Sequence, residues 1–344
     1  MNTRRQSAYL RGIAILAVCL NHFLNRYVPA APRGYAGGAI SIFFLLSGYG
    51  IGHHLPGRHV SDWLEFFGRR AQRIYPLFWL WCYLHGFFNG TLGFFALDIY
   101  PSRSAWFVPA IVLCYVATPA LVVLLERHRP WHVFAGLGVL ILAVHGGLVS
   151  AGFAPLKAAA FKGVFFSQFA FYLVGIILAR QHRSASTDAL SRRASGLRVL
   201  ASVGVFAVAV NENATTQMFA FPGHREVTTV ALLAAGYWMS ATFLHYAGPL
   251  PLSRAVGFLG TFSYSTYLFH EYGFVVLERL GILSRGTSSP WGLAVWIVFL
   301  PILVAGLGLI ESVTMCLIRR RWQWTAPFRN MQHAWQLGGQ TRPA

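Results

Sequence analysis

Long apolar stretches alternate with short polar or basic segments along the whole chain of 344 residues. A helix of about 20 apolar residues is long enough to cross the roughly 30 Å hydrocarbon core of a bilayer. The pattern therefore predicts an all-α, polytopic membrane protein with about ten transmembrane helices. The predicted spans run approximately Ala8–Val28, Gly37–His54, Ile74–Gly90, Trp106–Leu125, Trp131–Ser150, Gly163–Arg180, Leu197–Asn213, Val227–Tyr246, Val256–Leu280 and Trp291–Ile318.

The composition supports a membrane protein and argues against a nucleic-acid-binding one. Hydrophobic residues make up 56% of the chain and charged residues only 11%, whereas soluble domains carry roughly 25% charged residues. The net charge of +18 comes from basic residues that lie between the apolar stretches. A nucleic-acid-binding protein would instead gather them on a soluble basic patch. Anionic lipid headgroups, or an anionic substrate, are the partners that this charge favours.

The four cysteines are isolated within apolar stretches and show neither CxxC spacing nor a Cys/His cluster; they are Cys19, Cys82, Cys114 and Cys316. Such a pattern predicts neither structural disulfides nor a zinc site. No metal is expected from the sequence.

The distribution of basic residues orients the predicted spans. With a cytoplasmic N-terminus and alternating segments, nineteen Lys and Arg residues fall on the cytoplasmic side, eight fall on the opposite side, and Arg11 lies inside the first span. This asymmetry follows the positive-inside rule. We therefore expect both termini to be cytoplasmic, with one transmembrane domain over residues 1–330 and a short tail over residues 331–344.

The first segment has an alternative interpretation as a signal peptide. Arg4 and Arg5 would form its basic region, Gly12–Leu20 its apolar core, and Val28-Pro29-Ala30 its cleavage site. The apolar segment continues past His22 without a clear polar region before that site. We therefore favour a retained membrane span.

Arg11 and His22 are two ionisable residues within this first span. At about 100° per residue, eleven positions return a helix to within about 20° of the same face, roughly 16 Å further along its axis. Ionisable groups inside a membrane are costly and are by default functional candidates. The pair predicts a cation near the cytoplasmic surface and an imidazole near the middle of the membrane, both facing one interior groove.

Ser47 and Gly48 follow two phenylalanines in the second span. Small residues in membrane helices usually serve close helix packing. A functional alternative places the Ser47 hydroxyl in the same groove as His22, and the residues alone leave both interpretations open.

Basic residues also precede the third span, where Arg69 and Arg73 are four positions apart and would share a helix face. Pro76 predicts a break or kink just as the chain enters the membrane. Two arginines fixed on one face can grip a phosphate group, although anchoring at the cytoplasmic surface is the commoner role of such residues.

The ninth span contains an unusually polar run, Ser263–Glu271, which includes Tyr267 and His270. Structural needs within a membrane helix call for few hydroxyl groups, so the run is a candidate for function. A lone histidine such as His270 is more often a hydrogen-bonded core residue.

In combination these residues resemble the acyltransferase-3 family of integral membrane acyltransferases, over roughly Ala8 to Ile318. Each motif alone is weak, but their order along the chain is specific. Gly50, Gly52 and Glu271 depart from the usual pattern of the family. The matching motifs are Arg11-x10-His22, Phe43-Phe44-x-x-Ser47-Gly48-Tyr49, Arg69-Arg70-x-x-Arg73-Ile74-Tyr75-Pro76, Trp106-Phe107 with Tyr115 and Pro119, Ser263-Tyr264-x-x-Tyr267-Leu268-x-His270, and Glu311.

The resemblance implies ten transmembrane helices in a bacterial-type inner (plasma) membrane. It also implies transfer of an acyl group, commonly acetyl from acetyl-CoA, to a hydroxyl group of a carbohydrate or glycolipid of the cell envelope. The expected partners are membrane lipids and this acceptor, with no nucleic acid. A hydroxyl group needs a general base at neutral pH, and a buried, neutral imidazole can take its proton.

We therefore expect His22 to be the general base. No acidic residue is adjacent to it in the sequence, so a partner that orients it must come from another helix. The donor site would use Arg11 with Arg69 and Arg73. Tyr75 and Tyr267 would donate hydrogen bonds to the thioester oxygen. Ser47, which would orient His22 or carry the acyl group, and His270 complete the candidate set.

Two other classes of protein fit parts of the pattern. A transporter or exporter of a lipid-linked or acylated sugar would also place His, Arg and Tyr along a path through the membrane, but it would often show inverted repeats, and none is evident. A non-catalytic scaffold would have no need of the clustered polar residues. Acyl transfer across the membrane, from a cytoplasmic donor to an external acceptor, is a further hypothesis.

Overall fold

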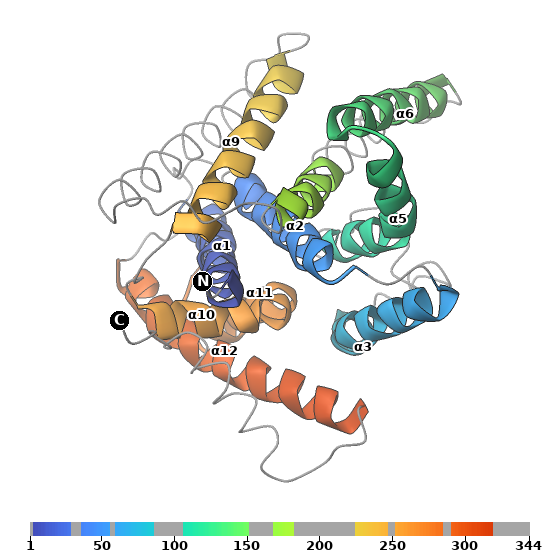
Figure 1. The fold of residues 1–344 in the computed structure, drawn as a ribbon. Helices are drawn as coiled ribbons and strands as arrows, with labels where there is room; N and C mark the ends of the chain where they lie inside the picture. Colours follow the sequence, from blue (N-terminus) through green and yellow to red (C-terminus); the bar gives the residue numbers. More distant parts are fainter. Residues whose placement is uncertain are drawn as a thin grey trace. The chain divides into compact units, whose positions relative to one another are not determined.

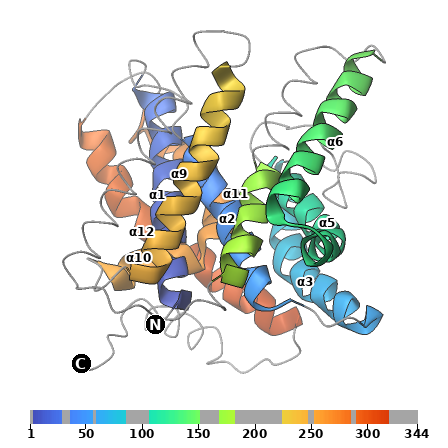
Figure 2. The same cartoon turned by 45° about the horizontal axis from the view of Figure 1, so that its top comes forward.

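A computed structural model describes residues 3–28, 36–55, 59–85, 106–150, 168–181, 224–246, 252–284 and 290–318. All regular secondary structure within these ranges is α-helical, which confirms the predicted fold class. Figures 1 and 2 show the helices in two views. They are α1 (Thr3–Tyr27), α2 (Ala36–His53), α3 (Val60–His85), α5 (Phe107–Arg127), α6 (Pro130–Ser150), α9 (His224–Tyr246), α10 (Ser253–Thr261), α11 (Ser263–Arg279) and α12 (Pro290–Ile318), together with the helix Gln168–Gln181.

The predicted span Leu197–Asn213 lies outside the described residues, and every other predicted span overlaps one of these helices. Three helical segments of the described chain are long and apolar enough to cross a membrane: Arg5–Tyr27, Phe107–Arg127 and Ala294–Leu317. The number of ten spans and the orientation of the termini stay predictions.

Of the break or kink predicted at Pro76, the break is wrong, and the kink stays a prediction. Helix α3 starts well before the predicted span, at Val60, and continues through Pro76 to His85. Proline removes one hydrogen bond from a helix interior. Here the buried side chains of Ile74, Leu77 and Phe78 pack on either side of it. This burial offsets the loss, so the helix is not interrupted.

The predicted ninth span, Val256–Leu280, is also wrong as a single helix. Its residues form α10 and α11, which meet at Phe262, where φ is −101° and ψ is 22°. The hydroxyl groups of Ser265 and Thr266 donate to the carbonyl oxygen of Phe262, at 3.0 Å and 2.8 Å. Hydroxyl groups that bond back to backbone carbonyls bend helices. Part of the polar run therefore has a structural role at this junction.

The chain forms two compact units. The first contains residues 1–43, 75–81 and 188–344, and so includes α1 and α9 to α12. The second contains residues 44–74 and 82–187, and so includes α5, α6 and the helix Gln168–Gln181.

In the first unit α1 contacts α9, α10 and α11, and α11 contacts α12 (Figures 1 and 2). Glycine allows the closest of these contacts. A Cβ atom on Gly12 would overlap the backbone carbonyl of Val256, and one on Gly260 would overlap that of Ala8. Helices α1 and α10 therefore pack antiparallel, with their backbones in contact at small residues, as is common in membrane proteins.

In the second unit α2 packs parallel to the helix Gln168–Gln181 in the same manner. A Cβ atom on Gly48 would overlap the carbonyl of Tyr172, and one on Gly175 would overlap that of Leu45. Gly52 faces Ala179, where an added Cβ would lie 2.6 Å from the alanine Cβ. The packing interpretation of Gly48 is therefore confirmed.

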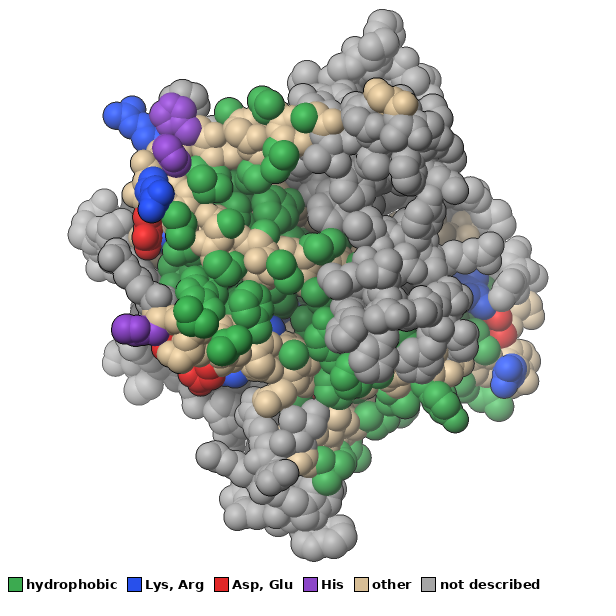
Figure 3. Space-filling view, turned by 90° about the vertical axis from the view of Figure 1, so that its right-hand side faces the viewer, with side chains coloured by type: hydrophobic (Ala, Val, Ile, Leu, Met, Phe, Trp, Pro, Cys, Tyr) green, Lys and Arg blue, Asp and Glu red, His purple; other side chains and the backbone are tan. Residues whose placement is uncertain are grey.

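Exposed apolar side chains lie on α5 and on the part of α6 whose side chains the structure describes. Val116 on α5 is 58% exposed and Val139 on α6 is 67% exposed, while the turn between the two helices carries the exposed residues Arg127 and Arg129. Figure 3 shows hydrophobic side chains over the middle of one face, with the charged side chains near its edges. An exposed apolar surface bounded by basic residues is typical of a lipid-facing surface.

The contact between α2 and the helix Gln168–Gln181 gives a first prediction. Replacement Gly48→Ala should lower the thermal stability of the purified protein in detergent, because overpacking of this kind destabilises by about 1–3 kcal/mol. The matched control is Gly50→Ala on the same helix, since a Cβ at Gly50 meets no atom within 4 Å. Equal melting temperatures for the two variants would contradict the close approach of Gly48 to the backbone of Tyr172.

Candidate active site

Helices α1 and α11 bring three ionisable side chains together in the first unit. The Nδ1 atom of His22 on α1 lies 3.5 Å from Oε1 of Glu271 on α11. The ring of His22 also lies edge-on to that of His270, with 4.9 Å between centroids. His22 and Glu271 are 35% and 32% exposed, so solutes can reach both side chains. The acidic residue beside His22 therefore comes from another helix, α11.

His270 lies behind this pair and is 2% exposed. Its Nδ1 atom is 2.7 Å from the carbonyl oxygen of Tyr267. A carbonyl oxygen can only accept, so Nδ1 carries the proton and Nε2 keeps its lone pair. The buried Nε2 atom has no hydrogen-bond partner within the described ranges. Of the two ring nitrogens of His270, only Nδ1 therefore has a hydrogen-bond partner among the described residues.

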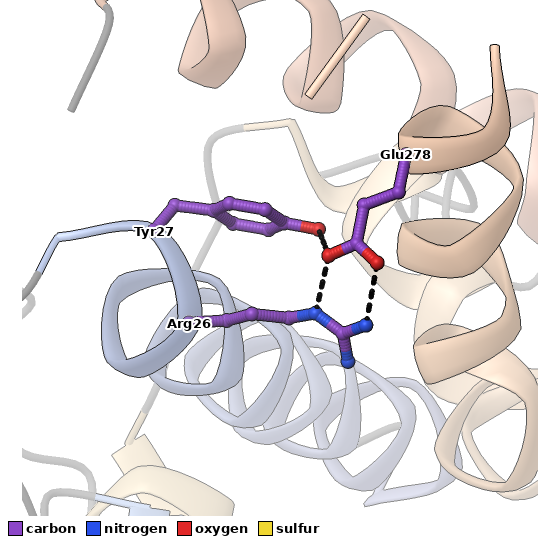
Figure 4. A network of polar contacts seen from close by, with 3 residues as sticks. All are labelled: Arg26, Tyr27 and Glu278. Atoms are coloured by element: carbon purple, nitrogen blue, oxygen red, sulfur yellow. Dashed lines mark hydrogen bonds and ion pairs between the residues drawn. The ribbon is translucent and has the colours of Figure 1, made fainter. Parts of the chain in front are cut away.

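A bidentate ion pair holds the same two helices together one turn further along. Arg26 donates from Nε and Nη2 to the two carboxylate oxygens of Glu278, at 2.7 Å and 2.8 Å, and the Tyr27 hydroxyl donates to Oε1 at 2.9 Å (Figure 4). Arg26 and Glu278 are only 23% and 19% exposed. Charge-assisted bidentate pairs are strong and fix geometry.

The spacing of these residues explains why they meet. His22 and Arg26 are four positions apart on α1, and Glu271, Phe274 and Glu278 follow spacings of three and four on α11. Each set therefore lies on one helix face. Arg26 and Glu278 are not among the predicted site residues, although their spacing from His22 and Glu271 is a signal that could have found them.

An open pocket of about 190 Å³ borders the pair, lined by His22, Asn25, Arg26, Glu271 and Phe274. It therefore places an imidazole, a carboxylate and a guanidinium group around one small volume. Such a set can exchange a proton with a bound hydroxyl group and hydrogen-bond its neighbours.

Arg11 and Tyr267 belong to the same unit. Helix α1 is continuous from Thr3 to Tyr27, so the spacing from Arg11 to His22 is helical throughout. Arg11 donates to the hydroxyl of Ser7 at 3.0 Å. Tyr267 is buried, with its ring centroid 6.1 Å from that of His270.

Tyr75 also lies in the first unit, on α3, and its ring packs 5.4 Å from that of Trp79.

Ser47, Arg69 and Arg73 belong to the second unit. Ser47 is half-buried on α2. Arg69 and Arg73 are exposed on α3, and Arg69 forms an ion pair with Glu65. They therefore lie in a different unit from His22, His270 and Glu271.

Arg70, between these two arginines, is the residue that packs inward. Its guanidinium carbon lies 5.5 Å from the ring centre of Phe66 and 5.4 Å from that of Tyr115. Both distances are within the range of cation–π attraction. Arg70 is not predicted to pack inward from the sequence, although it is four positions after Phe66 on one helix face.

The ion pair between α1 and α11 gives a second prediction. Replacement Glu278→Ala leaves Arg26 largely buried without its partner, and it should destabilise the protein by about 3–5 kcal/mol. The matched control is Glu65→Ala, which removes an exposed pair on α3 worth about 0–1 kcal/mol. Thermal unfolding in detergent compares the two variants, and similar small effects would contradict the structural role given to Glu278.

The comparisons with known proteins agree with a membrane enzyme. A family model described as an acyltransferase domain matches residues 7–324, from the start of α1 to beyond α12. No curated protein and no solved structure gives a significant match to the chain.

Proposed function

The chain belongs to the acyltransferase-3 family, and we propose that it transfers an acyl group from acyl-CoA, most simply acetyl-CoA, to a hydroxyl group of a carbohydrate or glycolipid of the cell envelope. The observation that carries this proposal is the pairing of His22 with Glu271 at the wall of an open pocket. The family match gives no support to the transporter alternative.

In this proposal His22 is the general base and Glu271 its positioning residue. The Glu271 carboxylate accepts a hydrogen bond from the protonated Nδ1 of His22, which leaves Nε2 as the basic atom. The carboxylate also stabilises the imidazolium that forms. At 3.5 Å the two atoms are within ion-pair distance, and such contacts tighten when a substrate binds.

The transfer step then needs only the acceptor, the thioester donor and His22. The acceptor hydroxyl gives its proton to Nε2 of His22 as its oxygen bonds to the thioester carbonyl carbon. The carbon–sulfur bond breaks as the tetrahedral intermediate collapses, and the leaving thiolate takes the proton from the imidazolium. Tyr267, whose ring lies beside His270, and Tyr75 are proposed hydrogen-bond donors to the developing oxyanion.

The donor would be held by cations away from the pocket. Arg11 precedes His22 by eleven residues on one continuous helix, a distance of roughly 16 Å. Arg69 and Arg73 are exposed on α3, and both are therefore accessible to the phosphates of a soluble donor. We propose that these three residues bind the donor and that transfer is direct, without an acyl group carried by Ser47.

This arrangement supports transfer across a bacterial-type inner membrane. The predicted orientation places Arg11 near the cytoplasmic surface and the pocket around Asn25 and Arg26 toward the opposite surface. Acyl-CoA would then enter from the cytoplasm, and the acceptor would reach His22 from outside. Membrane lipids and the glycan acceptor are the proposed partners.

The roles of His22 and Glu271 give a third prediction. The protein in liposomes is supplied with radiolabelled acetyl-CoA and candidate glycans or glycolipids. His22→Ala should lower kcat by about 10²–10⁴-fold, the usual contribution of a general base. Glu271→Gln should lower kcat by a smaller factor while the KM for acetyl-CoA changes little, because it acts through His22.

The controls use the same assay. Arg11→Ala should mainly raise the KM for acetyl-CoA. His128→Ala, at an exposed turn of the second unit, should behave like the wild type. Transfer that persists in His22→Ala would exclude His22 as the base. Glycan flux without CoA consumption would instead favour the transporter.

A further inference from the structure

We propose that His22, His270 and Glu271 form a binding site for a divalent transition-metal ion such as Zn²⁺, and that occupancy of this site inhibits acyl transfer. One potential ligand atom from each of the three residues lies within 4.8 Å of the others. Two imidazoles and one carboxylate are a common ligand set for zinc with an open coordination position.

His270 is the strongest evidence for a ligand. A histidine that binds a metal usually donates its other ring N–H to a backbone carbonyl or a carboxylate. His270 already makes this contact, from Nδ1 to the carbonyl oxygen of Tyr267 at 2.7 Å. Its Nε2 atom is buried, and within the described residues it has no hydrogen-bond partner. A metal ion would satisfy this lone pair.

The distances are close to those of a coordinated ion. Zn–N and Zn–O bonds of about 2.0–2.2 Å in a tetrahedral site place ligand atoms roughly 3.4 Å apart. His22 Nδ1 and Glu271 Oε1 are 3.5 Å apart. The remaining separations within the cluster are at most 4.8 Å, so side-chain rotations that draw the atoms together by up to about 1.4 Å would complete the site.

The surroundings leave the site accessible and negatively charged. Its open side faces the pocket lined by Asn25 and Phe274, where water could complete the coordination of the ion. The nearby cation, Arg26, is already held by both carboxylate oxygens of Glu278. The charge of Glu271 therefore remains available to a metal.

Metal binding and base catalysis exclude each other here. Coordination through Nδ1 of His22 places a dication on the ring, which lowers the basicity of Nε2, and it withdraws Glu271 from its positioning role. The ion is thus an inhibitor and not a cofactor of the transfer. The inhibitory half of this proposal rests on the proposed function, whereas the binding half does not.

The binding half is tested on the full-length protein, purified in detergent without a histidine tag and stripped with EDTA. Isothermal titration with Zn²⁺ should give one site per chain. His270→Ala and Glu271→Gln should each weaken it at least ten-fold, since loss of an outer partner alone costs about 10–100-fold. The control variant His128→Ala/His132→Ala removes two histidines of the α5–α6 turn region and should bind like the wild type, and size-exclusion profiles check folding.

The inhibitory half is tested by transfer assays with and without Zn²⁺. Wild-type transfer should fall as the site fills and return on addition of EDTA, whereas any residual transfer by His270→Ala should be insensitive to Zn²⁺. Absent binding, or equal affinity in all variants, would overturn the metal site. Stoichiometric binding that leaves transfer unchanged or raises it would overturn the inhibition. If no acceptor is acylated under any condition, the proposed function fails while the titration still decides the metal site.

Discussion

The packing of α1 against α11 is the contact on which the candidate site depends. His22 comes from the first helix of the chain, whereas His270 and Glu271 come from a helix near its end. The bidentate pair between Arg26 and Glu278 lies one turn from His22 and is largely shielded from solvent. Because removing one partner of such a pair is costly, it fixes the axial position at which His22 meets Glu271.

Small residues and hydroxyl groups make this packing possible. Gly12 and Gly260 let the backbones of α1 and α10 touch. The junction at Phe262, where hydroxyl groups bond to the backbone carbonyl, separates α10 from α11. Helix α1 can therefore contact two successive helices. The structural role of these polar residues in turn serves the site, because His270 and Glu271 follow directly in α11.

The sequence was sufficient to predict the helices, but not which side chains of different helices contact one another. Apolar length identified the segments, and eleven-residue spacing placed Arg11 and His22 on one face, because both depend on local helix geometry. The sequence marks Glu271 as the end of a polar run and as a departure from the family pattern, but it pairs neither Glu271 nor Glu278 with a residue of the first helix. Their roles depend on the register between two distant helices, which no local pattern encodes. The same reason hid the cluster of His22 with His270. The break predicted at Pro76 is absent because the burial of side chains on both sides of the proline outweighs its low helix propensity.

A double-mutant cycle on His22 and Glu271 tests the central claim most directly, with acetyl transfer in liposomes as the measured rate. If Glu271 acts only by positioning His22, the variant His22→Ala/Glu271→Gln should be no slower than His22→Ala alone, because the second change removes a partner that no longer has a base to orient. Losses that multiply, as for independent sites, would contradict the pairing of these two residues in catalysis.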